Sequence, residues 1–340
     1  MKIMKFLAIL PVLALAACWG GSSGNRSAGT GDSSAADEAD APLHAFPLMS
    51  VPVVYENNAA EAREYSLEHY WDGFFSKGGG TDSKSILGVA DADVEQALAN
   101  YIGALAAVKS LATPDSLAPL RQAQKSVRTL FGKLENHQKA DTSSLTYLRF
   151  TEMVSRYLFD PNSPVRDEDL YLPFVEAMER SSCTSDDMRA AYSYEARQCR
   201  TNQYGQKVPD FRYSTASGSK GSLYGVKADY TMLFFSNPGC TACKDIIDQV
   251  LSRPYVERYI KEGRLAVVNI YIDEEISKWR DYLHNYPSYW INGYDYTFQL
   301  RDSGKYDIRA IPSLYLLDSS KRVLFKDAPT ENVLSFLDTI

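Results

Sequence analysis

Apolar residues recur at steps of three and four positions through much of the chain between residues 58 and 200. Two such stripes, over residues 94–108 and 120–134, are separated by Pro114. This spacing is typical of amphipathic helices with one buried face, and a proline at that point ends the first helix. The same pattern predicts further helices over residues 61–75, 143–159, 167–180 and 186–199. We therefore predict an all-α domain over residues 43–203.

The pattern changes after about residue 204, where short apolar runs alternate with polar segments. Four runs are strand candidates, over residues 231–235, 265–272, 313–317 and 322–325. Helical spacing lies between the first two runs and again over residues 331–337. A strand–helix–strand unit followed by a hairpin and a last helix indicates an α/β domain, which we place over residues 204–340.

The first residues differ from both domains. A basic start is followed by an apolar run over residues 6–17, which is too short to span a bilayer and is typical of a signal peptide. The segment Leu15-Ala16-Ala17-Cys18 resembles the bacterial lipobox, which implies cleavage after residue 17 and lipid attachment to the Cys18 sulfur. We expect a signal peptide over residues 1–17 and a flexible tether over residues 18–42. The mature protein would then be anchored to a membrane of the cell envelope, facing the periplasm or the cell exterior.

Composition adds little to this organisation. The chain has 340 residues, 45% of them hydrophobic and 23% charged, as in an ordinary globular protein. Its formal net charge of −7 is spread along the chain, and the sequence has no basic block that would attract nucleic acid. We expect no nucleic-acid partner.

Two of the five cysteines form a C-x-x-C motif between a predicted strand and a predicted helix. Cys240 and Cys243 follow the strand predicted over residues 231–235 and precede a helix predicted over residues 244–251. The start of a helix offers unpaired N–H groups and the positive end of the helix dipole, which stabilise a thiolate. The first cysteine can then attack a disulfide, and the second can resolve the mixed disulfide that forms.

Two segments resemble the thioredoxin-like superfamily, and most closely the exported TlpA- and ResA-like oxidoreductases. They are residues 234–244 (FFSNPGCTACK) and 306–318 (YDIRAIPSLYLLD). The resemblance implies a central mixed sheet flanked by helices, and a cis-proline at Pro312 that lies against the redox pair. It implies that the Ile311 backbone pairs with a substrate strand. Residues expected to contact substrate beside the pair are Gly239, Thr241 and Ala242.

The resemblance also implies which cofactor and which partners the site uses. No cofactor is expected besides the Cys240–Cys243 disulfide. The expected partners are protein disulfides and a thiol electron donor of the membrane or periplasm. Tryptophans at Trp279 and Trp290 lie where exported members often carry a Trp-bearing connection.

The motif departs from thioredoxin itself at three places. Gly239 replaces the tryptophan usual before the first cysteine, and the dipeptide is Thr-Ala instead of Gly-Pro. Phe234 occupies the position where cytosolic thioredoxins bury an aspartate. The usual proton acceptor for the second cysteine is therefore missing or comes from elsewhere. Asp273, at the end of a predicted strand, is one candidate, and an ordinary strand-end aspartate is the alternative.

Other interpretations of the motif remain open. A zinc site needs about four ligands, and His284 is the only histidine after Cys243, which disfavours zinc. A binding module with a structural C-x-x-C disulfide is one alternative to an oxidoreductase. A thiol peroxidase is another, although the chain lacks a Pro-x-x-x-Thr-x-x-Cys motif.

The helical domain also resembles a known type. Residues 64–72 (EYSLEHYWD) are similar to the opening of a helical domain of unknown function that precedes thioredoxin-like domains in lipoproteins of Gram-negative anaerobes. Within this segment His69 and Trp71 are candidates for a binding feature, but packing between helices is the favoured interpretation.

The remaining cysteines, Cys183 and Cys199, test the helix predicted between them. A helix over this segment places their Cα atoms about 21 Å or more apart, whereas a disulfide needs less than about 7 Å. We favour the helix, with Cys199 facing a core or lying free near the domain junction.

Overall fold

The computed structural model describes residues 43–55, 57–306 and 308–340, which fall within one compact unit. The predicted signal peptide, the lipidation of Cys18 and the whole predicted tether lie outside the described residues. None of the helices in the described part of the chain is long and apolar enough to cross a membrane.

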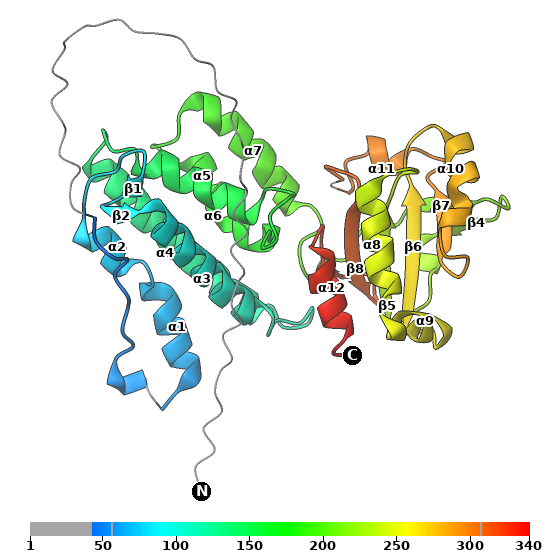
Figure 1. Cartoon of the computed structure of the whole chain (residues 1–340), viewed down its shortest axis with the longest axis horizontal. Helices are drawn as coiled ribbons and strands as arrows, with labels where there is room; N and C mark the ends of the chain where they lie inside the picture. The colour runs from blue at the N-terminus through cyan, green and yellow to red at the C-terminus, as the bar shows by residue number, and fades with distance from the viewer. Residues whose placement is uncertain (1–42, 56, 307) are drawn as a thin grey trace, which may run out of the picture. The chain divides into compact units, whose positions relative to one another are not determined.

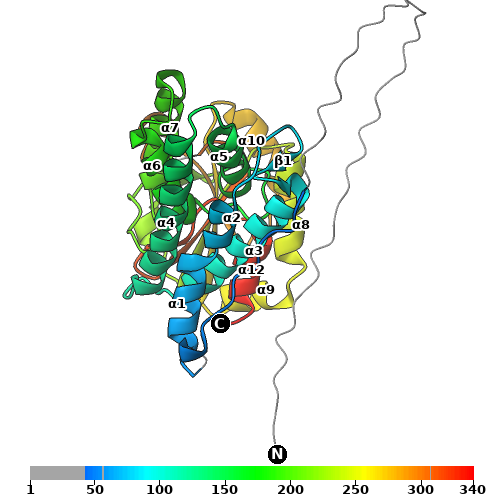
Figure 2. The ribbon, with the colours of Figure 1, turned by 90° about the vertical axis from the view of Figure 1, so that its left-hand side faces the viewer.

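Helices dominate the first part of the described chain (Figures 1 and 2). After a short 3-10 turn, η1 (Val53–Tyr55), they are α1 (Ala59–His69), α2 (Asp72–Lys77), α3 (Asp91–Lys109), α4 (Ala118–Ala140), α5 (Thr146–Leu158), α6 (Glu168–Arg180) and α7 (Asp186–Arg200). The predicted helices are all confirmed, although the segment predicted over residues 61–75 is divided into α1 and α2 at Trp71. The long helix α4 packs against α1, α3 and α6.

The expectation of a purely α-helical region needs one correction. Two short strands, β1 (Ser85–Ile86) and β2 (Val89–Ala90), pair antiparallel. The residues between them, Leu87 and Gly88, have φ values of 54° and 72°, as a two-residue hairpin turn requires. Strands of two residues are too short to produce a recognisable alternation of apolar and polar positions.

An aromatic cluster forms one end of the helical core. The Trp71 side chain, 1% exposed, packs edge-on against Phe74, Tyr101 and Phe150 with ring centres 5.2–5.6 Å apart. His69 hydrogen-bonds Asp72 through Nδ1 at 2.6 Å. The packing interpretation of Trp71 is therefore confirmed.

The second part of the chain is built on a seven-stranded mixed sheet with the order β4-β3-β7-β6-β5-β8-β9. The strands are β3 (Arg212–Thr215), β4 (Lys220–Ser222), β5 (Tyr230–Phe235), β6 (Leu265–Tyr271), β7 (Ile291–Tyr294), β8 (Ser313–Asp318) and β9 (Val323–Phe325). Strands β5, β6 and β7 are parallel, and the other pairings are antiparallel. The predicted mixed sheet is thus confirmed.

Side chains of alternate residues in β5 enter two separate apolar clusters. Met232 and Phe234 face one cluster, together with residues of α8 (Thr241–Leu251), α9 (Pro254–Lys261) and α12 (Thr330–Leu337). Leu233 and Phe235 face the other cluster. Figure 1 shows α8 and α12 in front of the sheet. The shorter elements are α10 (Ile276–Tyr282), α11 (Gln299–Asp302) and the 3-10 turns η2 (Leu223–Gly225) and η3 (Leu283–Asn285). Both faces of β5 are therefore buried, which explains its continuous apolar sequence.

Strands β3, β4 and β7 were not predicted from the sequence. The segment that follows Trp290, expected to be a connection, instead forms β7, which is parallel to β6 and antiparallel to β3. A Cβ atom at Gly293 would lie 2.8 Å from the Tyr213 ring, so close strand packing requires glycine there. The glycine and polar residues that this packing needs hide the strand pattern.

Cys183 and Cys199 lie as the predicted helix between them requires. Helix α7 runs unbroken from Asp186 to Arg200, so it separates Cys183 from Cys199 by too great a distance for a bridge between them. Cys199 is 1% exposed in the helical core, and Cys183 packs against the same core from its edge.

Candidate functional site

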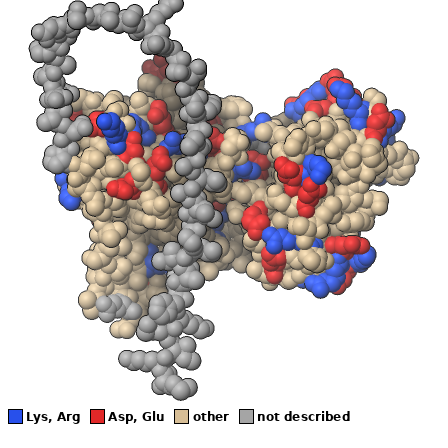
Figure 3. Space-filling view, in the orientation of Figure 1, with Lys and Arg blue, Asp and Glu red and all other residues tan. Residues whose placement is uncertain are grey.

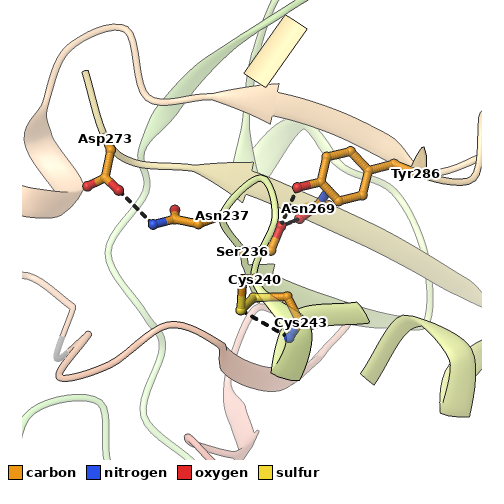
Figure 4. Close-up of a disulfide and its surroundings, with 7 residues drawn as sticks. All are labelled: Ser236, Asn237, Cys240, Cys243, Asn269, Asp273 and Tyr286. Carbon is orange, nitrogen blue, oxygen red and sulfur yellow. Dashed lines mark hydrogen bonds between the residues drawn. A yellow bond between two sulfur atoms is a disulfide. The ribbon is translucent and has the colours of Figure 1, made fainter. Parts of the chain in front are cut away.

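The site centres on a disulfide between Cys240 and Cys243 at the first turn of α8 (Figure 4). Their Cα atoms are 5.2 Å apart. Cys240 is the N-cap of the helix, and its Sγ accepts the backbone N–H of Cys243 at 3.1 Å. Cys240 is partly exposed, whereas Cys243 is 2% exposed. Cys240 is therefore the sulfur that a partner molecule can reach.

The loop before Cys240 explains its glycine. Strand β5 ends at Phe235, and four residues lead to the helix. Gly239 has a φ of 74°, a left-handed conformation that glycine adopts without strain. The Cys240 N–H then donates to the Asn237 carbonyl at 3.3 Å. A tryptophan at position 239, as in thioredoxin, would be strained in this conformation.

Residues of the first helical turn surround the exposed sulfur. Thr241 and Ala242 are both exposed, as is Gly239 on the other side of Cys240. The structure therefore brings all three predicted substrate contacts to the same surface as the disulfide. Their function in substrate binding stays a prediction.

The peptide bond between Ile311 and Pro312 is cis, as the resemblance implied. Strands β5 and β8 are antiparallel, with Phe235 opposite Ser313. Pro312 therefore precedes β8 at the same end of the sheet at which the loop to Cys240 begins. Ile311 and Cys240 pack against the same apolar cluster. Two segments about 70 residues apart in the sequence thus meet at one end of the sheet.

A chain of buried and half-buried polar side chains, not predicted from the sequence, begins in the loop at Ser236. Ser236 donates to Asn269 Oδ1 at 2.6 Å, and its Oγ lies 3.2 Å from the Tyr286 hydroxyl. Asn269 donates to Asn292 Oδ1 at 3.0 Å. Burial raises the pKa of Tyr286, which keeps its hydroxyl protonated. Asn269 was the available signal, because it is a polar residue inside an otherwise apolar strand.

Asp273, the candidate proton acceptor for the second cysteine, contacts the loop before the motif. Its carboxylate accepts the Asn237 side-chain N–H at 2.7 Å, on the outer side of the loop (Figure 4). Phe234, 1% exposed, belongs to the apolar cluster that contains Cys243. Trp279 and Trp290 belong to it as well. The surroundings of Cys243 are therefore largely apolar.

Metal ligands do not gather in the described part of the chain. No group of three or more His, Cys, Asp and Glu side chains that could hold a metal ion occurs among residues 43–55, 57–306 and 308–340. His284 is exposed and its ring contacts the Asp281 carbonyl. On the face seen in Figure 3, Lys and Arg side chains lie beside Asp and Glu, so that neither sign dominates.

The mixed sheet, the C-x-x-C disulfide at a helix start and the cis-proline before β8 define a thioredoxin-like fold. Residues 22–202 match the family model "Domain of unknown function (DUF5106)". The chain belongs to this family, with a thioredoxin-like region following the DUF5106 region.

Several solved structures are similar to this chain. A thioredoxin-like protein from Bacteroides caccae is 34% identical, with a TM-score of 0.71 over 87% of this chain and 99% of that chain. The C-terminal domain of an uncharacterized protein from Bacteroides fragilis is 41% identical over 40% of this chain and 98% of its own, with a TM-score of 0.39. A domain of a possible thiol-disulfide isomerase from Cytophaga hutchinsonii is 26% identical over 41% and 94%, with a TM-score of 0.35. No curated protein matches the chain.

Proposed function

We propose that this protein is a thiol–disulfide oxidoreductase that exchanges disulfides in exported proteins. The observation that carries the proposal is the unequal exposure of the two cysteines at the start of α8. Cys240 is accessible and caps the helix, and Cys243 is buried behind it. This arrangement suits a nucleophile and a resolving thiol.

The reaction follows from these positions. In the reduced protein, the Cys240 thiolate attacks a substrate disulfide, and the first substrate sulfur leaves as a thiolate that takes up a proton. Cys243 then loses its proton and attacks the Cys240 sulfur of the mixed disulfide. The second substrate thiol is released, and the Cys240–Cys243 disulfide remains. The substrate gains two electrons from the protein, and an external thiol donor then supplies two electrons of its own that reduce the Cys240–Cys243 disulfide again.

The substrate would lie along the cis-proline loop. The backbone of Ile311 is the expected pairing partner for an extended substrate strand, and Pro312 shapes the groove beside the disulfide. Pairing through backbone groups is insensitive to substrate sequence. It is therefore suited to a protein that acts on several exported proteins.

The expected location also belongs to this proposal. The lipobox-like segment supports a lipid on Cys18 and a tether to a membrane of the cell envelope. Mass spectrometry of the purified N-terminus should find a diacylglyceryl group on Cys18, and Cys18→Ala should leave an unmodified chain. An unmodified wild-type N-terminus would contradict the anchor without affecting the chemistry.

Insulin reduction by a dithiol donor tests the activity. The wild-type protein should accelerate it, and Cys240→Ser should abolish the acceleration because no thiolate attacks the substrate. Equal rates for the two proteins would refute the proposal.

Alkylation of Cys240 against pH distinguishes the enzyme from a binding module. A catalytic thiol at a helix start should react with an apparent pKa well below the free value of about 8.5. An apparent pKa at that free value would instead indicate that the disulfide is structural.

A further inference from the structure

A buried cluster of charged side chains joins the helical region to the thioredoxin-like region. Glu168, in the first turn of α6, lies between two cations of the thioredoxin-like region. Its carboxylate oxygens are each 2.6 Å from a partner, the Arg309 guanidinium and the Lys326 ammonium. The Glu168 and Lys326 side chains are 6% exposed, and that of Arg309 is 11% exposed. Charges so far from water persist only when paired, so these contacts hold their members firmly.

Two further residues extend the cluster. The Asp327 carboxylate lies 3.4 Å from the Arg309 guanidinium and 3.9 Å from that of Arg166. Arg166 also donates through Nε to the Asp327 carbonyl. Arg166 and Glu168 belong to the helical region, while the other three members belong to the thioredoxin-like region. Both sides therefore contribute cations and anions to one network.

Arg309 connects this network to the cis-proline loop. It is the only polar side chain among residues 308–312, the segment that ends in Pro312. Its guanidinium donates to the Phe159 carbonyl at 3.3 Å and lies 4.3 Å from the centre of the Phe159 ring. Ile311 packs against the apolar clusters of the sheet. Arg309 thus ties this loop by polar contacts to the end of α5 and the start of α6.

We propose that Glu168 is a positioning residue for the site. Through Arg309 it holds the backbone of residues 308–312 in place, so the DUF5106 region determines how tightly the disulfide site binds protein substrates. The effect on substrate binding rests on the proposed function. The effect on the loop rests on the contacts alone.

The test compares Glu168→Gln with a control substitution at a second, exposed ion pair between the two regions, in the full-length protein. Glu168→Gln removes the charge and keeps the side-chain size. The control is Asp115→Asn, because Asp115 also pairs with a thioredoxin-like cation, Arg322, at 2.6 Å. That pair lies at the β8–β9 turn, at the other end of β8 from Pro312. Hydrogen–deuterium exchange of residues 308–313 and insulin-reduction kinetics are measured for both variants.

The two variants should behave differently. In Glu168→Gln, residues 308–313 should exchange faster, and the KM for insulin should rise roughly 2- to 30-fold while kcat stays unchanged. The rate with oxidised glutathione should also stay unchanged, since so small a disulfide does not lie along the loop. Asp115→Asn should leave all these values at the wild-type level.

Other outcomes would overturn the proposal. Loop exchange that is unchanged in Glu168→Gln, or equally raised in Asp115→Asn, refutes the positioning role. Faster loop exchange with an unchanged KM refutes the link to substrate binding. If the wild-type protein itself fails to reduce insulin, the proposed function fails, and loop exchange still decides the positioning role.

A second variant tests the proposal in case Glu168→Gln alone does not fold. Removing one partner of a buried ion pair is strongly destabilising, so Glu168→Gln alone could fail to fold. The double variant Glu168→Gln/Lys326→Gln removes one charge of each sign and leaves the net charge of the cluster unchanged. It should show the same faster loop exchange and raised KM.

Discussion

The helical and thioredoxin-like regions use buried polar groups in different ways. In the helical core, Ser126 joins the Tyr101 hydroxyl to the Leu67 carbonyl, and these bonds connect helices of the same core. In the thioredoxin-like region, Ser236 joins Asn269 and Tyr286 at the start of the loop that leads to the disulfide. One network connects packed helices, and the other contacts the loop that carries the Cys240–Cys243 disulfide. The difference indicates that buried polar groups connect helices in one region, whereas in the other they lie at the end of the sheet beside the disulfide loop.

The largest difference between the regions should come from replacing one cysteine by serine in each of them. Cys243→Ser should stop multiple turnover and trap a mixed disulfide between Cys240 and the substrate, because the resolving thiol is gone. Cys183→Ser, at the edge of the helical core, should retain turnover. Non-reducing electrophoresis and insulin reduction measure both effects. A Cys243→Ser protein that turns over normally would place the chemistry elsewhere.

Core truncations should separate stability from activity. Phe174→Ala and Phe235→Ala each remove a ring that is 0% exposed, and each should lower the free energy of unfolding by about 3–5 kcal/mol. Only Phe235→Ala should also slow insulin reduction under folding conditions, because Phe235 ends the strand that leads to Cys240. Urea denaturation and activity assays check this, and equal loss of activity in both variants would mean that the regions are not distinct in function.

The two buried serines provide a smaller and closer comparison. Ser236→Ala and Ser126→Ala each leave buried partners without a hydrogen bond, which should cost about 1–3 kcal/mol of stability. Ser236→Ala alone should change the reduction potential of the Cys240–Cys243 couple, measured against a glutathione buffer. If the reduction potential of the couple is unchanged in both variants, the Ser236 network contributes to packing alone.

The smallest effect concerns pH and lies in the helical region. Burial raises the pKa of Glu195 from its ordinary 4.5, although a hydrogen bond from Tyr171 at 2.7 Å opposes this. Between pH 4.5 and the raised value, the folded chain binds more protons than the unfolded chain, so stability falls as the pH rises.

Replacing this carboxyl isolates its contribution. Glu195→Gln removes it, so the variant should gain stability over wild type above this window and lose the advantage at lower pH. Urea denaturation over pH 4–8 measures the difference. A difference that does not change with pH would contradict the shift.

The sequence by itself determined the helices, the central strands and the location of the motif. Helices such as α3 and α4 depend on contacts between residues three and four positions apart, so their pattern is local. Strands β5, β6 and β8 are buried on both faces, and their apolar runs are equally visible. The cis bond at Pro312 followed from a resemblance carried by the residues around it.

The tertiary structure alone decided which separated residues meet. Strand β7 requires glycine at position 293 because the Tyr213 ring packs closely against it. Nothing in the sequence around either residue predicts this contact. The pairing of Glu168 with Arg309 joins positions 141 residues apart, and the Ser236–Asn269 bond joins positions 33 residues apart. Such contacts depend on how the elements pack, which no local spacing records. For that reason the cysteines were evident from the sequence, while the polar groups that contact the disulfide loop and the cis-proline segment were not.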